Sequence, residues 1–256
     1  MNLTIFDELY KGKYRILELY SGTQSWSKPF RDNGHRVLSV ELNPMFTKEP
    51  FNLEQWTTSV ADITAKQVID ILGGKPDIIF ASPLCTTHSI AAISHHRQQQ
   101  LGFGNTDKYK RRTSLLTAKS DKAKFHDELL LHTLHLIQDL KPKLWFIENP
   151  VGGMRKSPLM QGVMFRHTIT YCSYGDNSMK PTDIWTNHPN TNFKERCFNG
   201  NVDCHHESAP RGSKTGTQGK KGNMERSIIP KEFCDHIYKI CDTHIKEITQ
   251  WNNGKQ

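Results

Sequence analysis

The sequence contains a series of short apolar runs that each stop at a polar, glycine or proline residue, and this pattern constrains the fold most. Apolar runs of this length predict buried strands, and segments with helical periodicity lie between them. Strands that alternate with helices predict an α/β protein with a doubly wound, mostly parallel sheet. Because ligands bind at the carboxyl ends of the strands in such a sheet, the residues that follow each run are the first candidates for a functional site.

Apolar periodicity and helix-capping residues give the approximate bounds of the expected elements. We expect strands over 14–20, 36–40, 77–81, 144–147, 168–172 and 183–185. We expect helices over 25–33, over 125–140 and from Pro230 onward, and a helix tail over 68–72. The segment 188–224 is rich in Asn, Gly, Lys and His and has almost no periodic apolar pattern. We therefore predict a main domain formed by 1–187 and 225–256, and a small irregular region over 188–224.

Length and composition exclude several classes of protein. The chain has 256 residues, of which 36% are hydrophobic, and no apolar run approaches the length of a membrane span. Residues 1–15 lack the features of a signal peptide, so we expect a cytoplasmic protein whose six cysteines are thiols. The net charge of +8 favours a polyanionic partner, and the basic stretches 108–112 and 211–221 are expected to contact phosphates.

The first candidate site lies in the strand–helix–strand unit at the start of the chain. A glycine turn follows the first strand and consists of Tyr20, Ser21, Gly22 and Thr23. Glu41 follows about 20 residues later at the end of the second strand, a spacing that lets a carboxylate bind ribose hydroxyls. A single glycine leaves the G-x-G-x-x-G pattern incomplete, so a nucleoside without pyrophosphate, such as S-adenosylmethionine, fits better than a dinucleotide. Asp62 is a candidate acceptor for an adenine amino group.

The second candidate site is a cysteine that follows a buried strand. In PDIIFASPLCTTHS (76–89) the apolar run stops at Ser82 and Pro83, and Cys85 comes two residues later. The run LWFI (144–147) ends in the same way at Glu148 and Asn149. Since both turns follow strands of one parallel sheet, we expect the thiol, the carboxylate and the nucleoside site along one crevice.

Several motifs, in matching order, resemble those of the DNA (cytosine-5) methyltransferases, most closely the compact phage-type members. LELYSGTQSWS is similar to the cofactor loop, SVELNP to the ribose-acid strand and VADI to the adenine-contacting turn. ASPLC resembles the Pro-Cys nucleophile motif, and IENP resembles the Glu-Asn motif. YGDNSMKPTDIWTN is similar to the strand pair facing the target base, and ERSIIPKEFCDHI to the C-terminal segment beside the cofactor. The resemblance covers roughly 14–90, 125–187 and 225–240.

The resemblance implies transfer of a methyl group from S-adenosylmethionine to carbon 5 of a cytosine flipped out of double-stranded DNA. Cys85 would add to carbon 6 of the base, and Glu148 would hold ring nitrogen 3 and the exocyclic amine. Asn149 would hold the proline turn, and a helix beginning after Cys85 would help to lower the pKa of the thiol. The cofactor would contact Tyr20, Ser21, Gly22, Thr23, Glu41, Asp62, Ser82 and Pro83.

The sequence departs from the family pattern near the expected target base. Leu84 stands where the family has a second proline or joins Pro directly to Cys. Lys180 and Thr182 match the family's paired arginines, so Lys180 or Arg155 is expected to contact oxygen 2 of cytosine. The short region 188–224 would serve target recognition and predicts a short or relaxed recognition sequence.

Three alternative functions remain open from the sequence. They are an RNA cytosine-5 methyltransferase, transfer of a modified group from a modified cofactor, and a catalytically silent nucleic-acid-binding protein of the same fold. The segment 88–112 after the cysteine turn is a candidate loop that closes on DNA. We favour a monomer.

The stretch CFNGNVDCHH (197–206) contains four residues of the zinc-binding type: Cys197, Cys204, His205 and His206. The spacing C-x6-C-H-H is not that of a standard zinc finger, and adjacent histidines rarely bind one ion together. We therefore expect no metal site.

Overall fold

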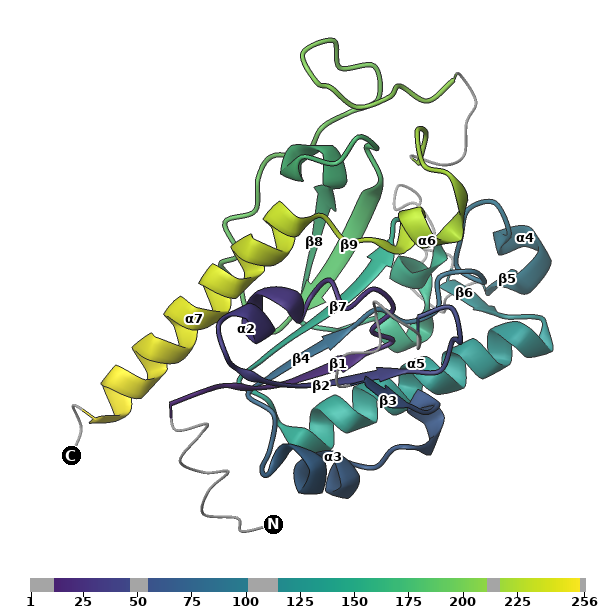
Figure 1. The fold of residues 1–256 in the computed structure, drawn as a ribbon. Helices are drawn as coiled ribbons and strands as arrows, with labels where there is room; N and C mark the ends of the chain where they lie inside the picture. Colours follow the sequence, from purple (N-terminus) through teal and green to yellow (C-terminus); the bar gives the residue numbers. More distant parts are fainter. Residues whose placement is uncertain (1–11, 47–54, 101–114, 211–216, 254–256) are drawn as a thin grey trace, which may run out of the picture.

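A seven-stranded sheet with the strand order β3-β2-β1-β4-β7-β9-β8 forms the centre of the computed structural model, which describes residues 12–46, 55–100, 115–210 and 217–253 (Figure 1). Five neighbouring strands are parallel: β3 (Gln55–Thr57), β2 (Arg36–Glu41), β1 (Arg15–Leu19), β4 (Ile78–Ala81) and β7 (Leu144–Pro150). β9 (Pro181–Thr186) lies antiparallel between β7 and β8 (Phe165–Thr170). The expected doubly wound, mostly parallel sheet is confirmed.

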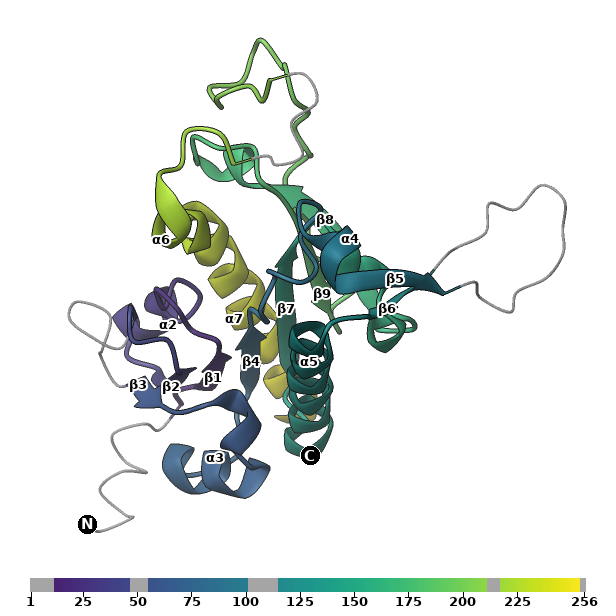
Figure 2. The same cartoon turned by 90° about the vertical axis from the view of Figure 1, so that its right-hand side faces the viewer.

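Helices cover both faces of this sheet (Figures 1 and 2). The helices α2 (Lys28–Asp32) and α7 (Lys231–Asn253) pack on one face, and α3 (Ala65–Leu72) and α5 (Asp121–Leu140) pack on the other. Successive strand residues point to opposite layers, so Ile78 joins the first cluster and Ile79 joins the second. The central strands therefore appear in the sequence as continuous apolar runs, because both of their faces are buried.

Side-chain caps explain where the two helices on the second face begin. Thr64 and Gln67 form a capping box at the start of α3, and Gly73 ends that helix in the left-handed conformation at φ 66°. The Ser120 side chain accepts a hydrogen bond from the Ala123 N–H, which starts α5 at Asp121. The expected start of this helix at 125 was therefore wrong. Its first turn is mostly polar and shows no apolar periodicity, but the Ser120 cap stabilises it.

Several short elements were not predicted from the sequence. The two-stranded sheet of β5 (Arg97–Gln100) and β6 (Leu115–Ala118) projects from the main sheet next to α4 (Ile93–His96) (Figure 2). Four 3-10 helices and a short α-helix complete the described elements: η1 (Val60–Asp62), η2 (Gly153–Lys156), η3 (Pro158–Met160), η4 (Tyr171–Tyr174) and α6 (Gly222–Ser227). These segments are too short to show a helical or strand period, and β5 consists of the polar sequence RQQQ.

The irregular region was expected from composition, and residues 187–210 contain no helix or strand. The segment starts beside the amino end of β7, where Asn187 Nδ2 donates to the Lys143 carbonyl oxygen at 2.9 Å, and its later part extends beyond the opposite end of the sheet (Figures 1 and 2). The basic stretch 108–112 and residues 211–216 lie outside the described residues. Residues 217–221 of the second basic stretch are described. There Lys220 Nζ forms an ion pair with Asp176 Oδ2 at 2.8 Å, so its charge is paired within the protein. Among the described helices, none combines the length and the apolar character needed to cross a membrane.

The buried carboxyl group of Glu18 in β1 makes the stability of the protein depend on pH. Burial raises the pKa of this group from 4.5 to about 7, although the Ser27 hydroxyl hydrogen bonds to it. The proton on Glu18 therefore stabilises the fold fully below pH 4.5, and this contribution is lost as the pH rises through about 7. A pKa difference of this size corresponds to about 3 kcal/mol.

We expect Glu18→Gln, which has the shape of the protonated side chain, to raise the melting temperature at pH 8 by several degrees. The gain should be smaller at pH 5, where Glu18 is still protonated in the folded protein. Thermal denaturation at both pH values measures the difference. Glu247→Gln, at an exposed position of α7, is the control and should shift the two melting temperatures equally. A Glu18→Gln variant that is less stable than the wild type at pH 8 would show that ionised Glu18 does not destabilise the fold.

Candidate active site at the carboxyl edge of the sheet

Parallel strands end at one edge of the sheet, and the predicted site residues lie along that edge. The Tyr20–Thr23 turn follows β1, Glu41 ends β2, and Asp62 lies in η1 after β3. The Ser82–Cys85 turn follows β4, and Glu148 and Asn149 lie at the end of β7. The topology therefore gathers these residues although they are far apart in the sequence.

Hydrogen bonds from three neighbouring elements hold the turn that carries Cys85. Asn149 Nδ2 donates to the Pro83 carbonyl oxygen at 2.8 Å, and the Ser82 N–H donates to the Leu19 carbonyl oxygen at 3.2 Å. Trp26 Nε1 donates to Ser82 Oγ at 3.2 Å. The turn is thus fixed to β7, β1 and the segment before α2, while Leu84 in its middle is exposed.

Glu148 is the centre of a buried polar cluster. The Tyr171 hydroxyl donates to Glu148 Oε1 at 3.1 Å, and Lys180 Nζ lies 4.0 Å from the same oxygen. Lys180 Nζ also lies 4.4 Å from the centre of the Tyr171 ring and donates to the Arg226 carbonyl oxygen at 2.7 Å. Burial raises the pKa of Glu148, against the nearby Lys180 charge and the Tyr171 hydrogen bond. The Glu148 carboxyl group is therefore protonated more readily than an exposed glutamate carboxyl group.

Cys85 is influenced by the same charges. Burial raises the pKa of its thiol, the Glu148 charge raises it further, and the Lys180 charge lowers it. The helix expected directly after Cys85 does not form, because turns occupy 86–92 and α4 begins only at Ile93. The expectation that a helix lowers the pKa of this thiol was therefore wrong.

Of the two cations expected to face a base, only Lys180 belongs to the Glu148 cluster. Arg155 Nε donates to Asp183 Oδ2 at 2.8 Å, and its Nη2 donates to the other oxygen of the same buried carboxylate. These two hydrogen bonds hold the Arg155 side chain against β9. Thr182 is completely buried, and its hydroxyl donates to the Lys180 carbonyl oxygen at 3.1 Å. Thr182 thus supports the backbone of Lys180, which has a φ of 24°.

The Glu41 carboxylate joins the ends of β1 and β2. Its Oε2 accepts from the Gly22 N–H at 2.8 Å, and its Oε1 accepts from the N–H groups of Leu42 at 3.0 Å and Asn43 at 2.7 Å. The residue is half-buried, so the carboxylate remains accessible. Gly22 has a φ of 49°, and a Cβ there would meet only the Tyr20 carbonyl oxygen, at 4.0 Å. The turn and the carboxylate form a cradle that is open above the glycine.

Tyr20 does not direct its hydroxyl toward a ligand. The hydroxyl donates to the Leu129 carbonyl oxygen of α5 at 3.2 Å and lies 3.0 Å from Thr133 Oγ1. Burial raises the pKa of Tyr20 to about 12. The hydroxyl thus fixes the glycine turn to α5, and the expected contact of Tyr20 with the cofactor stays a prediction.

The remaining residues of the expected nucleoside site differ in accessibility. Ser21 is buried, and its Oγ accepts from Gln55 Nε2 at 2.9 Å. Thr23 Oγ1 lies 2.7 Å from Ser25 Oγ and is half-buried. Asp62 is exposed in η1, beyond the end of β3. Thr23 and Asp62 are therefore reachable by a ligand, whereas Ser21 supports the loop.

A buried network that the sequence did not predict joins the Cys85 turn to α5. Arg97 Nε donates to the Thr87 carbonyl oxygen at 3.1 Å, and Arg97 Nη1 donates to Asp127 Oδ2 at 3.0 Å. Arg97 Nη2 lies 2.9 Å from His88 Nε2. Burial lowers the pKa of His88 to about 3, so this ring is neutral. The network fixes the residues that directly follow the cysteine turn.

We expect Arg97→Ala to lower the free energy of unfolding by about 3 kcal/mol, because it leaves buried polar partners without their cation. Lys66→Ala, which breaks the exposed Lys66–Asp70 pair, should cost less than about 1 kcal/mol. Urea denaturation of both variants measures the two values. Equal effects of the two substitutions would show that the Arg97 network does not stabilise the fold.

No protein-family model matches the sequence. A curated protein of Frog virus 3 (isolate Goorha), named "Probable DNA (cytosine-5)-methyltransferase", is 27% identical over 179 residues, covering 67% of this chain and 70% of the viral protein. This confirms the resemblance to the DNA (cytosine-5) methyltransferases.

Similar solved structures include two methyltransferases with low sequence identity. Magnesium protoporphyrin IX methyltransferase from Synechocystis PCC 6803, with bound SAM, is 10% identical with a TM-score of 0.37, covering 72% of this chain and 73% of that chain. A SAM-dependent methyltransferase from Neisseria gonorrhoeae is 14% identical with a TM-score of 0.36, covering 73% and 66% of the two chains. At these scores the assignment of the fold rests on the strand order described above.

Proposed function

We propose that the protein transfers a methyl group from S-adenosylmethionine to carbon 5 of a cytosine in double-stranded DNA. The observation that carries the proposal is the pairing of a thiol and a carboxyl group at adjacent strand ends. Cys85 follows β4, Glu148 lies at the end of β7, and the Glu148 charge acts on the pKa of Cys85. The similarity to the viral protein supports this choice of substrate.

Glu148 binds and polarises the cytosine. Its raised pKa lets the carboxyl group hold a proton at ring nitrogen 3, while its other oxygen accepts from the exocyclic amine. Tyr171 orients the carboxyl group through the hydrogen bond to Oε1. Lys180, close to the same oxygen, is the candidate donor to oxygen 2 of the base. A proton on nitrogen 3 draws electrons from carbon 6 and prepares that carbon for addition.

Cys85 attacks carbon 6 as a thiolate. The new bond moves an electron pair to carbon 5, which becomes nucleophilic enough to accept a methyl group. After the methyl transfer, which leaves S-adenosylhomocysteine, a water molecule takes the proton from carbon 5. The released electron pair re-forms the ring double bond and expels the Cys85 thiolate from carbon 6. The proton shared between Glu148 and ring nitrogen 3 offsets the carboxylate charge that raises the pKa of Cys85, and the Lys180 charge then favours the thiolate. Binding of the base and activation of the nucleophile are coupled in this way.

The opposite half of the edge holds the cofactor. S-adenosylmethionine supplies an electrophilic methyl group. The open cradle over Gly22 fits a ribose whose hydroxyls donate to Glu41, and the exposed Asp62 accepts from the adenine amino group. Thr23 and the turn of Ser82 and Pro83 are the remaining proposed contacts of the cofactor.

DNA enters from the side where the irregular region extends. The target carbon is inaccessible inside a duplex, so the cytosine must be flipped out of the stack. We propose that 188–224 contacts the target while the rest of the chain forms the catalytic domain. The net charge of +8 favours binding to the phosphates.

S-adenosylhomocysteine should stabilise the protein by binding only the folded state, by about 2.7 kcal/mol at 100 times its Kd. The melting temperature of the wild type should therefore rise with the ligand. Glu41→Gln, which removes one acceptor at the cradle, should reduce the shift, and the control Asp139→Asn, on the exposed side of α5, should keep it. A wild type that shows no shift at saturating ligand would disprove the cofactor assignment.

Duplex DNA that contains 5-fluorocytosine should trap the protein covalently in the presence of S-adenosylmethionine, because fluorine on carbon 5 cannot leave as a proton. The adduct should survive denaturing electrophoresis and be absent from Cys85→Ala. Cys241→Ala, in α7, should form it normally. Glu148→Gln should keep the cofactor shift but form the adduct about 10²–10⁴-fold more slowly, because it cannot supply a proton to the base.

Three results of this experiment would contradict the proposal. An adduct that persists in Cys85→Ala would identify another thiol as the nucleophile. An adduct formed only with modified RNA would favour an RNA methyltransferase. A wild type that binds cofactor and DNA without forming an adduct would favour a catalytically silent binding protein.

A further inference from the structure

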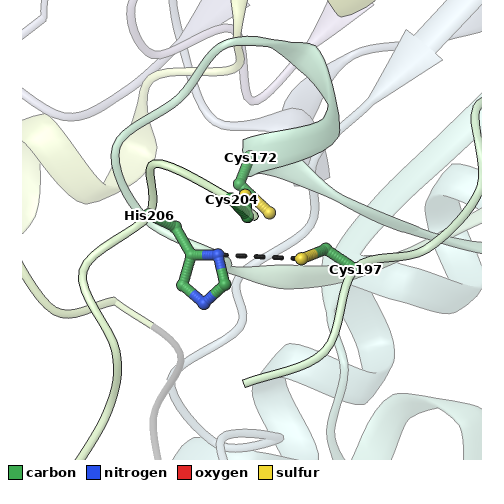
Figure 3. A group of neighbouring side chains, drawn as sticks. All are labelled: Cys172, Cys197, Cys204 and His206. Carbon is green, nitrogen blue, oxygen red and sulfur yellow. Dashed lines mark hydrogen bonds between the residues drawn. The ribbon is translucent and has the colours of Figure 1, made fainter. Parts of the chain in front are cut away.

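Four side chains of the metal-binding type converge where the irregular region meets the end of β8. They are Cys172, Cys197, Cys204 and His206, and Figure 3 shows them turned toward one another. Their four potential ligand atoms all lie within 4.8 Å of one another, and Cys197 Sγ lies 3.7 Å from His206 Nδ1. Tetrahedral zinc, with bonds of about 2.3 Å to sulfur and 2.0 Å to nitrogen, places neighbouring ligand atoms about 3.5–3.8 Å apart.

We propose that these four residues bind one zinc ion in a structural site of three cysteines and one histidine. Zinc readily binds three thiolates and an imidazole, whereas Mg²⁺ and Ca²⁺ prefer oxygen ligands. Four protein ligands complete a tetrahedron and leave no open position, as in zinc sites that stabilise folds. Binding would release the protons of the three thiols.

The ligand set differs from the one considered from the sequence. Cys172 lies in η4 directly after β8, far from the other three ligands in the chain, so spacing alone did not include it. His205 points elsewhere, because its Nε2 lies 3.0 Å from the Asp176 carbonyl oxygen. Only one of the two adjacent histidines, His206, belongs to the cluster, so the ligand set does not require both to bind one ion. The proposal therefore replaces the expectation of no metal site.

Burial and hydrogen bonding at the cluster match those of a structural site. Cys172 is 3% exposed and His206 is 5% exposed, while Cys197 and Cys204 are half-buried. Asn201 Nδ2 donates to Cys197 Sγ at 3.4 Å, and the Asn201 carbonyl oxygen accepts from the Cys204 N–H at 3.2 Å. A donor to a ligating sulfur stabilises the thiolate and orients it toward a metal.

Zinc would supply the cross-link that this region otherwise lacks. Phe193 packs against the core, but residues 197–210, which carry three of the four ligands, contain no helix or strand, and the apolar side chains of Phe198 and Val202 are 65% and 94% exposed. A segment that buries so little apolar surface gains little from hydrophobic packing to offset its loss of conformational entropy. The ion would fasten the segment to η4, and therefore to β8. On the proposed function, the same link would order the target-recognition region beside Tyr171, the neighbour of Cys172 that hydrogen bonds to Glu148.

The zinc content of the full chain tests the proposal directly. We expect inductively coupled plasma mass spectrometry to find about one zinc ion per chain, after purification without chelators and without a metal-affinity step. Cys204→Ser and His206→Ala should lose the ion, whereas the matched control His205→Ala should retain it. His206→Cys should also retain it, because a site of four cysteines suits zinc equally well, and this variant separates metal binding from a general failure to fold. Cys85→Ala should keep the zinc while losing the covalent adduct, which separates this proposal from the proposed function.

Cobalt substitution reports the ligand geometry independently. Protein loaded with Co²⁺ should show thiolate-to-cobalt charge-transfer bands and the strong visible bands of tetrahedral cobalt, and both should be weakened or lost in Cys204→Ser. A folded wild type that contains no zinc and binds neither added Zn²⁺ nor Co²⁺ would overturn the proposal. Equal zinc content in the wild type, Cys204→Ser and His206→Ala would overturn it too, as would a disulfide between two of these cysteines after purification under reducing conditions.

Discussion

The parallel pairing of β1, β4 and β7 is the constraint on which the rest of the molecule depends. Leu19 pairs with Ala81, and Ala81 pairs with Ile147, so β1 and β4 end at the same level while β7 continues to Pro150 along β9. Their backbone hydrogen bonds and two buried faces leave little freedom at the strand ends. The turns that follow inherit this rigidity, which holds the Cys85 thiol and the Glu148 carboxyl group in a fixed arrangement, as the proposed reaction requires.

Electrostatics then distinguishes the two halves of the edge. At the Glu41 end the carboxylate accepts three backbone N–H groups and is accessible to solvent, so it is suited to hydroxyl donors. At the Glu148 end the carboxyl group is buried beside Lys180 and Tyr171, so its proton and its charge both respond to what binds there. Two carboxyl groups of the same chemistry thereby differ in accessibility and in hydrogen-bond partners, which supports the different roles proposed for them.

The sequence predicted those features that depend on local patterns. The long apolar strands, α5 and the irregular region follow from periodicity and composition, and the positions of Cys85 after β4 and of Glu148 near the end of β7 follow from the turn signals, although β7 continues to Pro150 instead of stopping at 147. Features that depend on contacts between distant segments were missed. Arg97 meets Thr87 and Asp127, and Cys172 meets His206, only after the chain has folded, and neither set of contacts has a sequence spacing that indicates it. The helix after Cys85 was a local prediction that failed, because Thr87 and His88 instead bond to Arg97 in a turn.

The antiparallel pairing of β8 with β9 brings Thr170 next to Pro181, and two distant points of the chain are attached there. Both ends of the segment 197–226 are attached at the carboxyl edge, through the Cys197 N–H to Thr170 Oγ1 at 2.8 Å and the Arg226 carbonyl oxygen to Lys180 Nζ at 2.7 Å. A chain excursion that starts and finishes at one place can grow or shrink without moving the strands beneath it. Doubling its length costs only about 0.6 kcal/mol in loop-closure entropy. The length of this segment can therefore change while the sheet and the turns at its carboxyl edge stay unchanged.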